Sequence, residues 1–251
     1  NGIGDFYYAP PAGFLALCTQ NLPDATVIPS EHFNTVLYTA ATSNGTYQIT
    51  GNGFKPDFSW VKNRDNVEGH YLFDVIRGNT NMTDKFLQSN LTSAEGAGSV
   101  SGTTITVNDD GMQVVETSID SGELYFNGRT YVMWNWKAGG TAVSNTNGSI
   151  TSSVSANPSA GFSIATFVLP TTAQTIGHGL SKPPELIFQK GRATGSAWWT
   201  FAKPIGNTKA LRLDGTNATT TSQNFWNNTD PTSTVVTIGA NSGSNNNWLM
   251  Y

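Results

Sequence analysis

Residues 51–64 read Gly-Asn-Gly-Phe-Lys-Pro-Asp-Phe-Ser-Trp-Val-Lys-Asn-Arg, and an altered copy of this stretch runs from Gly177 to Arg192. The copy contains two extra residues before its proline, and from the Pro56–Pro184 pair onward the two stretches align without a gap. Matching residues are therefore separated by a constant number of positions, equal to that between Pro56 and Pro184, which is called the repeat spacing below. A second match, Tyr-Val-Met-Trp at 131–134 against Trp-Leu-Met-Tyr at 248–251, has a shorter spacing. These matches predict that the chain contains two related units.

The repeated stretch has the pattern of a turn followed by a strand. Its Gly-x-Gly pair can adopt positive φ in a tight turn, and the proline that follows favours an extended backbone. Apolar and polar residues then alternate, so that Phe58 and Trp60 share one face of the chain. The pattern predicts a strand with one face in a hydrophobic core.

The composition indicates an all-β protein. Charged residues make up 12% of the 251 residues, where roughly 25% is usual, and 26 residues are glycine. Short segments rich in β-branched and aromatic residues alternate with Gly, Asn and Asp turns, which is typical of β-sandwiches. We therefore predict an all-β fold of two tandem, related antiparallel β-sandwich domains, jelly-roll or lectin-like, after an extended N-terminal segment.

The repeat and the changes in composition divide the chain into four parts. They are residues 1–35, the end of a preceding domain plus a linker; 36–137, the first sandwich unit; 138–160, an ordered connector rich in Gly, Ser, Thr and Asn; and 161–251, the second unit. The first unit's closing strand continues into Asn135-Trp136-Lys137, so we expect a continuation beyond Tyr251 as well. The expected strands are 36–39, 46–50, 58–62, 70–76, 103–107, 112–117, 130–136, 162–168, 185–190, 197–202, 209–213 and 234–238, with a helical turn at 82–91.

Composition also disfavours several classes of site and partner. The 13 Lys and Arg are spread singly along a chain of net charge −4, so no basic patch for nucleic acid is expected. Cys18 is the single cysteine, which excludes an intramolecular disulfide and a multi-cysteine metal site. His32, His70 and His178 are far apart and lack zinc-ligand spacing. We expect no metal, no cofactor and no membrane span, since no apolar run is long enough.

Each repeated strand ends in a Lys-x-Arg pair, Lys62 with Arg64 and Lys190 with Arg192. Strand alternation places both cations of a pair on one face, which we expect to be the solvated one. Two interpretations stay open. The pairs are either solvated strand ends, the common case for surface charge, or a cationic rim that binds a ligand.

Trp198 is the other candidate for binding. Of the 7 tryptophans, most are expected in the core, because large aromatic side chains are mostly buried. Trp199 and Phe201 share one strand face, so Trp198 points the other way. Two interpretations stay open for Trp198: it lies in the core like the other tryptophans, or it is an exposed platform for a sugar ring or a subunit contact.

No catalytic group of residues is recognisable in the sequence, and we expect a protein that is not an enzyme. Glycoside hydrolysis needs two facing carboxylates, and none of the available ones lies in a cluster of aromatic and acidic residues. These carboxylates are Asp57, Asp74, Glu116 and Asp120. Asp109 and Asp110 precede Gly111 as in a hairpin turn, with a calcium site as the alternative.

Three stretches carry a resemblance to a known group of proteins. They are Gly4–Cys18, reading Gly-Asp-Phe-Tyr-Tyr-Ala-Pro-Pro-Ala-Gly-Phe-Leu-Ala-Leu-Cys; Tyr131–Ala142, reading Tyr-Val-Met-Trp-Asn-Trp-Lys-Ala-Gly-Gly-Thr-Ala; and the Gly-x-Gly-Phe-x-Pro-Asp-Phe repeat. With them the chain resembles the large structural proteins of marine tailed bacteriophages. In that group the first stretch closes a SPRY-like lectin domain, which would lie upstream of Asn1, and the repeated β-sandwich units follow it.

The resemblance implies a virion protein of the tail-fibre or appendage type, with no catalytic residues to carry over. We therefore expect a fibre, appendage or capsid-decorating component on the surface of the extracellular phage particle, in contact with the host surface. Its expected partners are other copies of itself, as a homotrimer by analogy with fibres, other virion proteins and a host surface glycan. The alternatives are a carbohydrate-binding module without catalysis and, less favoured, a polysaccharide depolymerase.

Overall fold

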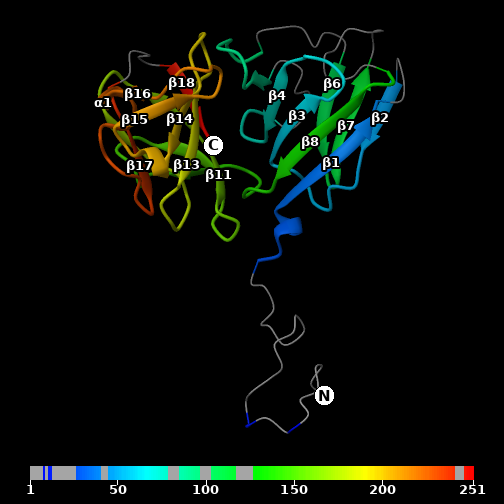
Figure 1. Cartoon of the computed structure of the whole chain (residues 1–251), viewed down its shortest axis with the longest axis horizontal. Helices are drawn as coiled ribbons and strands as arrows, with labels where there is room; N and C mark the ends of the chain where they lie inside the picture. Colours follow the sequence, from blue (N-terminus) through cyan, green and yellow to red (C-terminus); the bar gives the residue numbers. More distant parts are fainter. Residues whose placement is uncertain are drawn as a thin grey trace.

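The computed structural model describes residues 8, 11–12, 27–40, 45–78, 85–96, 103–116, 127–240 and 246–251, and the structural statements below concern these residues. Within them, the sheets are built from antiparallel strand pairs and the helices are short, so the predicted all-β antiparallel fold is confirmed. No helix in the described ranges has the length and apolarity to cross a membrane. Figure 1 shows two groups of strands side by side, with the end marked C between them.

The first group of strands, here called the first half, contains a five-stranded sheet of order β1-β8-β3-β4-β5 and a three-stranded sheet of order β2-β7-β6. The strands are β1 (Phe33–Thr39), β2 (Gly45–Ile49), β3 (Phe58–Asn63), β4 (His70–Asp74), β5 (Leu87–Gln88), β6 (Thr103–Asn108), β7 (Gly111–Glu116) and β8 (Thr130–Trp136). Buried side chains of both sheets, among them Val61, Tyr131 and Val114, form one core. A 3-10 helix at Pro29–Glu31 leads into β1.

The second half contains an eight-stranded sheet of order β16-β15-β14-β13-β18-β11-β10-β9 and the two-stranded sheet β12-β17. Its elements are β9 (Val143–Asn145), β10 (Ser152–Asn157), β11 (Phe162–Leu169), β12 (Gln174–Gly177), β13 (Leu186–Gly191), β14 (Trp199–Ala202), a 3-10 helix (Lys203–Ile205), β15 (Lys209–Arg212), β16 (Thr220–Thr221), α1 (Gln223–Trp226), β17 (Val235–Ile238) and β18 (Asn246–Met250). Its core joins side chains of both sheets and of α1, such as Phe167, Ile238 and Trp226.

Two local expectations are corrected. The connector 138–160 does more than run along the second half, because its strands β9 and β10 pair with each other and β10 pairs with β11. The expected helical turn at 82–91 is wrong where the structure describes it, since β5 lies there and pairs with β4; residues 82–84 lie outside the described ranges.

The two halves use the same central strand order. The run β1-β8-β3-β4-β5 corresponds position by position to β11-β18-β13-β14-β15. The strand registers agree with the sequence repeat. In the first half Trp60 pairs with Leu72, and in the second half Phe188 pairs with Thr200. Phe188 lies one repeat spacing after Trp60, and Thr200 lies one repeat spacing after Leu72. The sequence repeat thus marks strands that occupy matching places in the two halves.

A third core fills the space between the halves. It contains Phe58, Leu72 and Leu87 from the first half and Ile164, Trp198, Leu249 and Tyr251 from the second half. Strand β3 is therefore covered on both faces, with Val61 in the first core and Phe58 in the third. The prediction of a strand with only one face in a core is wrong, because the second half packs on the face that the alternation left open.

Candidate functional site

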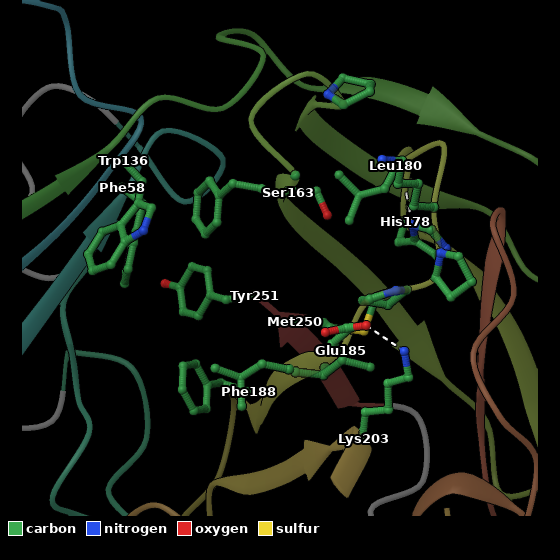
Figure 2. A pocket seen from close by; sticks show the side chains of 18 of the residues that line it. Phe58, Trp136, Ser163, His178, Leu180, Glu185, Phe188, Lys203, Met250 and Tyr251 are labelled. Carbon is green, nitrogen blue, oxygen red and sulfur yellow. Dashed lines mark hydrogen bonds and ion pairs between the residues drawn. The ribbon is translucent and has the colours of Figure 1, made fainter. Parts of the chain in front are cut away.

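An apolar cavity lies where the two halves meet, and its volume is about 610 Å³. This volume falls in the range of roughly 300–1,000 Å³ that is common for ligand sites, which often lie at domain interfaces. Figure 2 shows Phe58 and Trp136 on one side of the cavity, and His178, Leu180 and the Glu185–Lys203 pair on the other. Its aromatic lining consists of Phe58, Trp60, Trp136, Phe162, Phe188 and Tyr251.

Strand alternation explains why these rings lie together at the cavity. Phe58 and Trp60 lie on the outer face of β3, and Phe188 holds the place in β13 that Trp60 holds in β3. The rings of Trp60 and Phe188 meet edge to face, with centroids 6.3 Å apart and planes at 82°. The Phe58 and Tyr251 centroids are 4.3 Å apart. Such contacts fix the cavity wall. The half-buried rings of the lining give it an apolar surface; they are Trp60, Trp136, Phe162 and Phe188.

Few polar side chains reach the cavity. The Lys203 Nζ lies 2.5 Å from the Glu185 Oε1, and both side chains are exposed, at 68% and 69%. The ring of His178 is buried: its Nε2 lies 3.1 Å from the Thr232 carbonyl oxygen, and its Nδ1 accepts from the Leu180 amide. Burial lowers the pKa of His178, although the Thr232 contact opposes this. A neutral histidine with both nitrogens engaged positions the Gly177–Gly179 turn and is not available as an acid or base.

Beside the cavity, a buried polar cluster ties the halves together. The side chains of Asp74 and Arg77 form a fully buried ion pair, and the Arg77 guanidinium also donates to the Tyr251 hydroxyl at 3.1 Å. The Tyr251 hydroxyl donates in turn to the Asp74 carboxylate. Burial alone lowers the pKa of Arg77, but the Asp74 carboxylate reverses this and the net shift is upward. Burial raises the pKa of Tyr251 well above its ordinary value, so the hydroxyl stays protonated.

The structure does not place Trp198 as an exposed platform. Its side chain is 0% exposed, lies in the core between the halves, and stacks on Tyr251 at 6.3 Å. Its Nε1 donates to the Gln88 carbonyl oxygen at 2.8 Å. Of the two interpretations of Trp198, the exposed platform is wrong, because the face opposite Trp199 is covered by the first half.

The four cations do not form one rim. Lys62 donates to the carbonyl oxygens of Asn63 and Asn66 and so closes its own loop, while Arg64 is exposed. Lys190, expected on a solvated face, is instead 0% exposed.

Lys190 and Arg192 of the second half both bind residues of the first half. The Lys190 Nζ donates to the carbonyl oxygens of Thr92 and Ser196, and burial lowers the pKa of Lys190 to about 8 against the opposing charge of Asp214. Arg192 pairs with Glu95, also in the first half.

The Asp110 carboxylate has a structural role in the turn before β3. It accepts from the amides of Gly51 and Gly53, at 2.9 and 2.5 Å, and these bonds lower the pKa of Asp110. The structure thus agrees with the hairpin-turn interpretation of Asp110, whose carboxylate accepts from backbone amides of the repeated Gly-x-Gly motif. Within the described ranges, no group of three His, Cys, Asp or Glu side chains is arranged to hold a metal ion.

Sequence reasoning missed the cavity itself. Phe58 and Trp136 were visible as strand residues, and no local pattern showed that Phe162 and Phe188 would face them across the molecule. The available signal was the repeat: two related strands with matching apolar outer faces, β3 and β13, are able to cover each other.

Comparison with known proteins gives one match. Residues 28–251 match the model of the DUF7483 family, which is described as a domain of unknown function. No curated protein matches the chain. No solved structure matches it either.

Proposed function

Since the chain belongs to the DUF7483 family, whose function is unknown, we propose a role from its own fold: a non-enzymatic structural protein of a bacteriophage particle, in a tail fibre, another appendage or a capsid decoration. The observation that carries this proposal is the apolar core between the halves, which contains Phe58, Trp198 and Tyr251. Large hydrophobic interfaces suppress relative motion of domains. A stiff body is what a component of an extracellular particle requires.

The source of the rigidity also supports the proposal. The contact between the halves depends on buried rings, the buried Asp74–Arg77 pair and hydrogen bonds such as that from Trp198 to Gln88. Salt screens buried pairs much less than exposed ones. This construction therefore keeps its strength at the ionic strength of seawater, where a marine phage particle has to persist.

The test is to locate the protein on particles. Antibodies raised against the purified chain are applied to virions purified from the culture that carries its coding sequence, and gold labelling is viewed by electron microscopy. We expect labels at tails, fibres or the capsid surface, and the chain among virion proteins by mass spectrometry. Its absence from purified virions, with soluble protein in the lysate, would refute the proposal. Sedimentation equilibrium tests the proposed homotrimer.

A carbohydrate-binding module is the second candidate, and the aromatic lining of the cavity favours it. Rings such as Trp136 and Phe162 offer flat faces to a sugar, although Trp198 is buried and cannot take this part. A glycan array probed with the isolated chain separates the two functions, since a purely structural protein captures no glycan. Incubation with host capsule or lipopolysaccharide tests the depolymerase alternative, which requires a fall in polymer size.

A further inference from the structure

The outer face of the first half's five-stranded sheet is covered only in part. The residues that enter the core between the halves, Phe58, Leu72 and Leu87, come from β3, β4 and β5. On β8 and β1 the side chains of the same face are half-buried or exposed, and Leu37 is 61% exposed. This open part of the sheet is called the outer platform, and it consists of Thr35, Leu37, Trp60, Val132 and Trp134.

The outer platform presents aromatic rings that their neighbours hold in place. Strand pairing puts Trp134 between Thr35 of β1 and Trp60 of β3, so the three side chains share one face. The rings of Trp60 and Trp134 meet edge to face, with centroids 6.4 Å apart and planes at 84°. The Trp60 Nε1 donates to the His70 Nδ1 at 2.9 Å. Both tryptophans are half-buried, so part of each ring is open to solvent.

Hydrogen-bond donors lie beside the rings. Because the His70 Nδ1 accepts from Trp60, the neutral His70 ring carries its proton on Nε2, where it can donate to a ligand. Burial lowers the pKa of His70, and the charge of Lys62 adds to this, so the ring is neutral at pH 7. The Lys62 Nζ donates to the carbonyl oxygens of Asn63 and Asn66 and keeps a third proton for a ligand.

A cation lies next to these donors. The Arg64 amide donates to the Thr130 carbonyl oxygen at 2.9 Å and so continues the pairing of β3 with β8. By alternation, the Arg64 side chain points to the same face as Lys62 and Trp60. Arg64 is exposed, and within the described ranges its guanidinium makes no hydrogen bond or ion pair. The neighbouring carboxylate, Asp65, accepts instead from the amide and the hydroxyl of Thr130.

We propose that the outer platform binds an acidic polysaccharide, with one sugar ring against Trp134 and the carboxylate of a uronate unit on Arg64. Aromatic rings offer apolar faces to the C–H groups of a sugar, and a guanidinium matches the two oxygens of a carboxylate. From Trp60 to Arg64, β3 advances four residues, about 13 Å, so a chain of several sugar units fits the site better than a single sugar. The proposal rests on the second candidate function, carbohydrate binding, and places it on the sheet face instead of in the cavity.

The test measures binding of the whole chain to alginate, a polymer of uronate units, and to dextran, a neutral polymer, by isothermal titration calorimetry. We expect saturable binding to alginate with a change in tryptophan fluorescence, and binding to dextran about tenfold weaker, because dextran has no carboxylate for Arg64. Absence of alginate binding, or equal binding of the two polymers, would overturn the proposal. Neither result depends on whether the chain is found on virions, which tests the structural role separately.

Variants assign the binding to the outer platform. Arg64→Ala should weaken alginate binding about tenfold, and Lys209→Ala, which removes an exposed cation of the second half, should leave it unchanged. Equal losses would show binding through net charge alone and would refute the site. Trp134→Leu keeps apolar bulk without the flat ring and should also weaken binding, while the variant still melts cooperatively. Unchanged binding in this variant would contradict the proposal.

The same experiments distinguish a protein partner. If the chain binds no alginate but associates with itself, and Leu37→Asp abolishes the association, the outer platform is covered by a second copy and the proposal is wrong.

Discussion

Replacing Asp74 with Asn tests how much the buried cluster between the halves contributes. The side chains of Asp74 and Arg77 are both 0% exposed, and Arg77 also donates to the Leu72 carbonyl oxygen and the Tyr251 hydroxyl. Asn keeps the shape and the oxygen that accepts from the Arg77 amide, but it puts an NH2 group where the Arg77 Nε and the Tyr251 hydroxyl donate, so the change removes the charge and one acceptor. Because a buried guanidinium is left without its counter-charge, we expect the free energy of unfolding to fall by about 3–5 kcal/mol.

Denaturation in urea, followed by tryptophan fluorescence, measures this loss. The control is Glu185→Gln, which breaks an exposed pair with Lys203 and should leave the midpoint within experimental error. If both variants lost the same stability, burial would not be what makes the Asp74 pair important. If Asp74→Asn had no effect, the cluster would not hold the halves together, and the reasoning would be refuted.

Two further predictions concern the repeated Gly-x-Gly turn. Gly179→Ala should lower the stability of the protein more than Gly53→Ala. Both glycines have positive φ, which costs an alanine about 1–2 kcal/mol. Only at Gly179 would the new Cβ lie 2.9 Å from the Val154 side chain. Equal losses in thermal melts would contradict this. Burial lowers the pKa of His178 below 6.5, so the unfolded chain binds the proton more readily, and stability should fall as the pH drops below about 6.5. His178→Asn, which installs the residue of the first turn, Asn52, should reduce the fall in melting temperature between about pH 8 and pH 5, with the remaining slope due in part to His70, whose pKa burial also lowers. An unchanged slope would contradict this.

The sequence was informative where structure is local. Alternation and turn residues predicted most strands, and the repeat spacing carried the bounds of β3, Phe58–Asn63, onto those of β13, Leu186–Gly191. This worked because the strand pattern, the preceding proline and the Gly-x-Gly turn all depend on neighbouring residues.

The candidate site was not predictable in the same way. Alternation assigns a side chain to a face of a strand and does not say what covers that face. Lys190 and Trp198 were assigned to outer faces, and the groups that bury them, Thr92 and Gln88, come from the other half of the chain. The cavity likewise depends on contacts between distant segments, such as Trp60 with Phe188.

Scanning calorimetry of the whole chain addresses the central claim most directly, because a shared core makes the halves unfold together. We predict a single transition whose calorimetric enthalpy equals its van't Hoff enthalpy, and we expect Leu249→Ala, a change within the core between the halves, to lower its temperature without splitting it. Two separable transitions in the unmodified chain, with only one of them shifted by Leu249→Ala, would show that the halves are independent domains and would contradict the account.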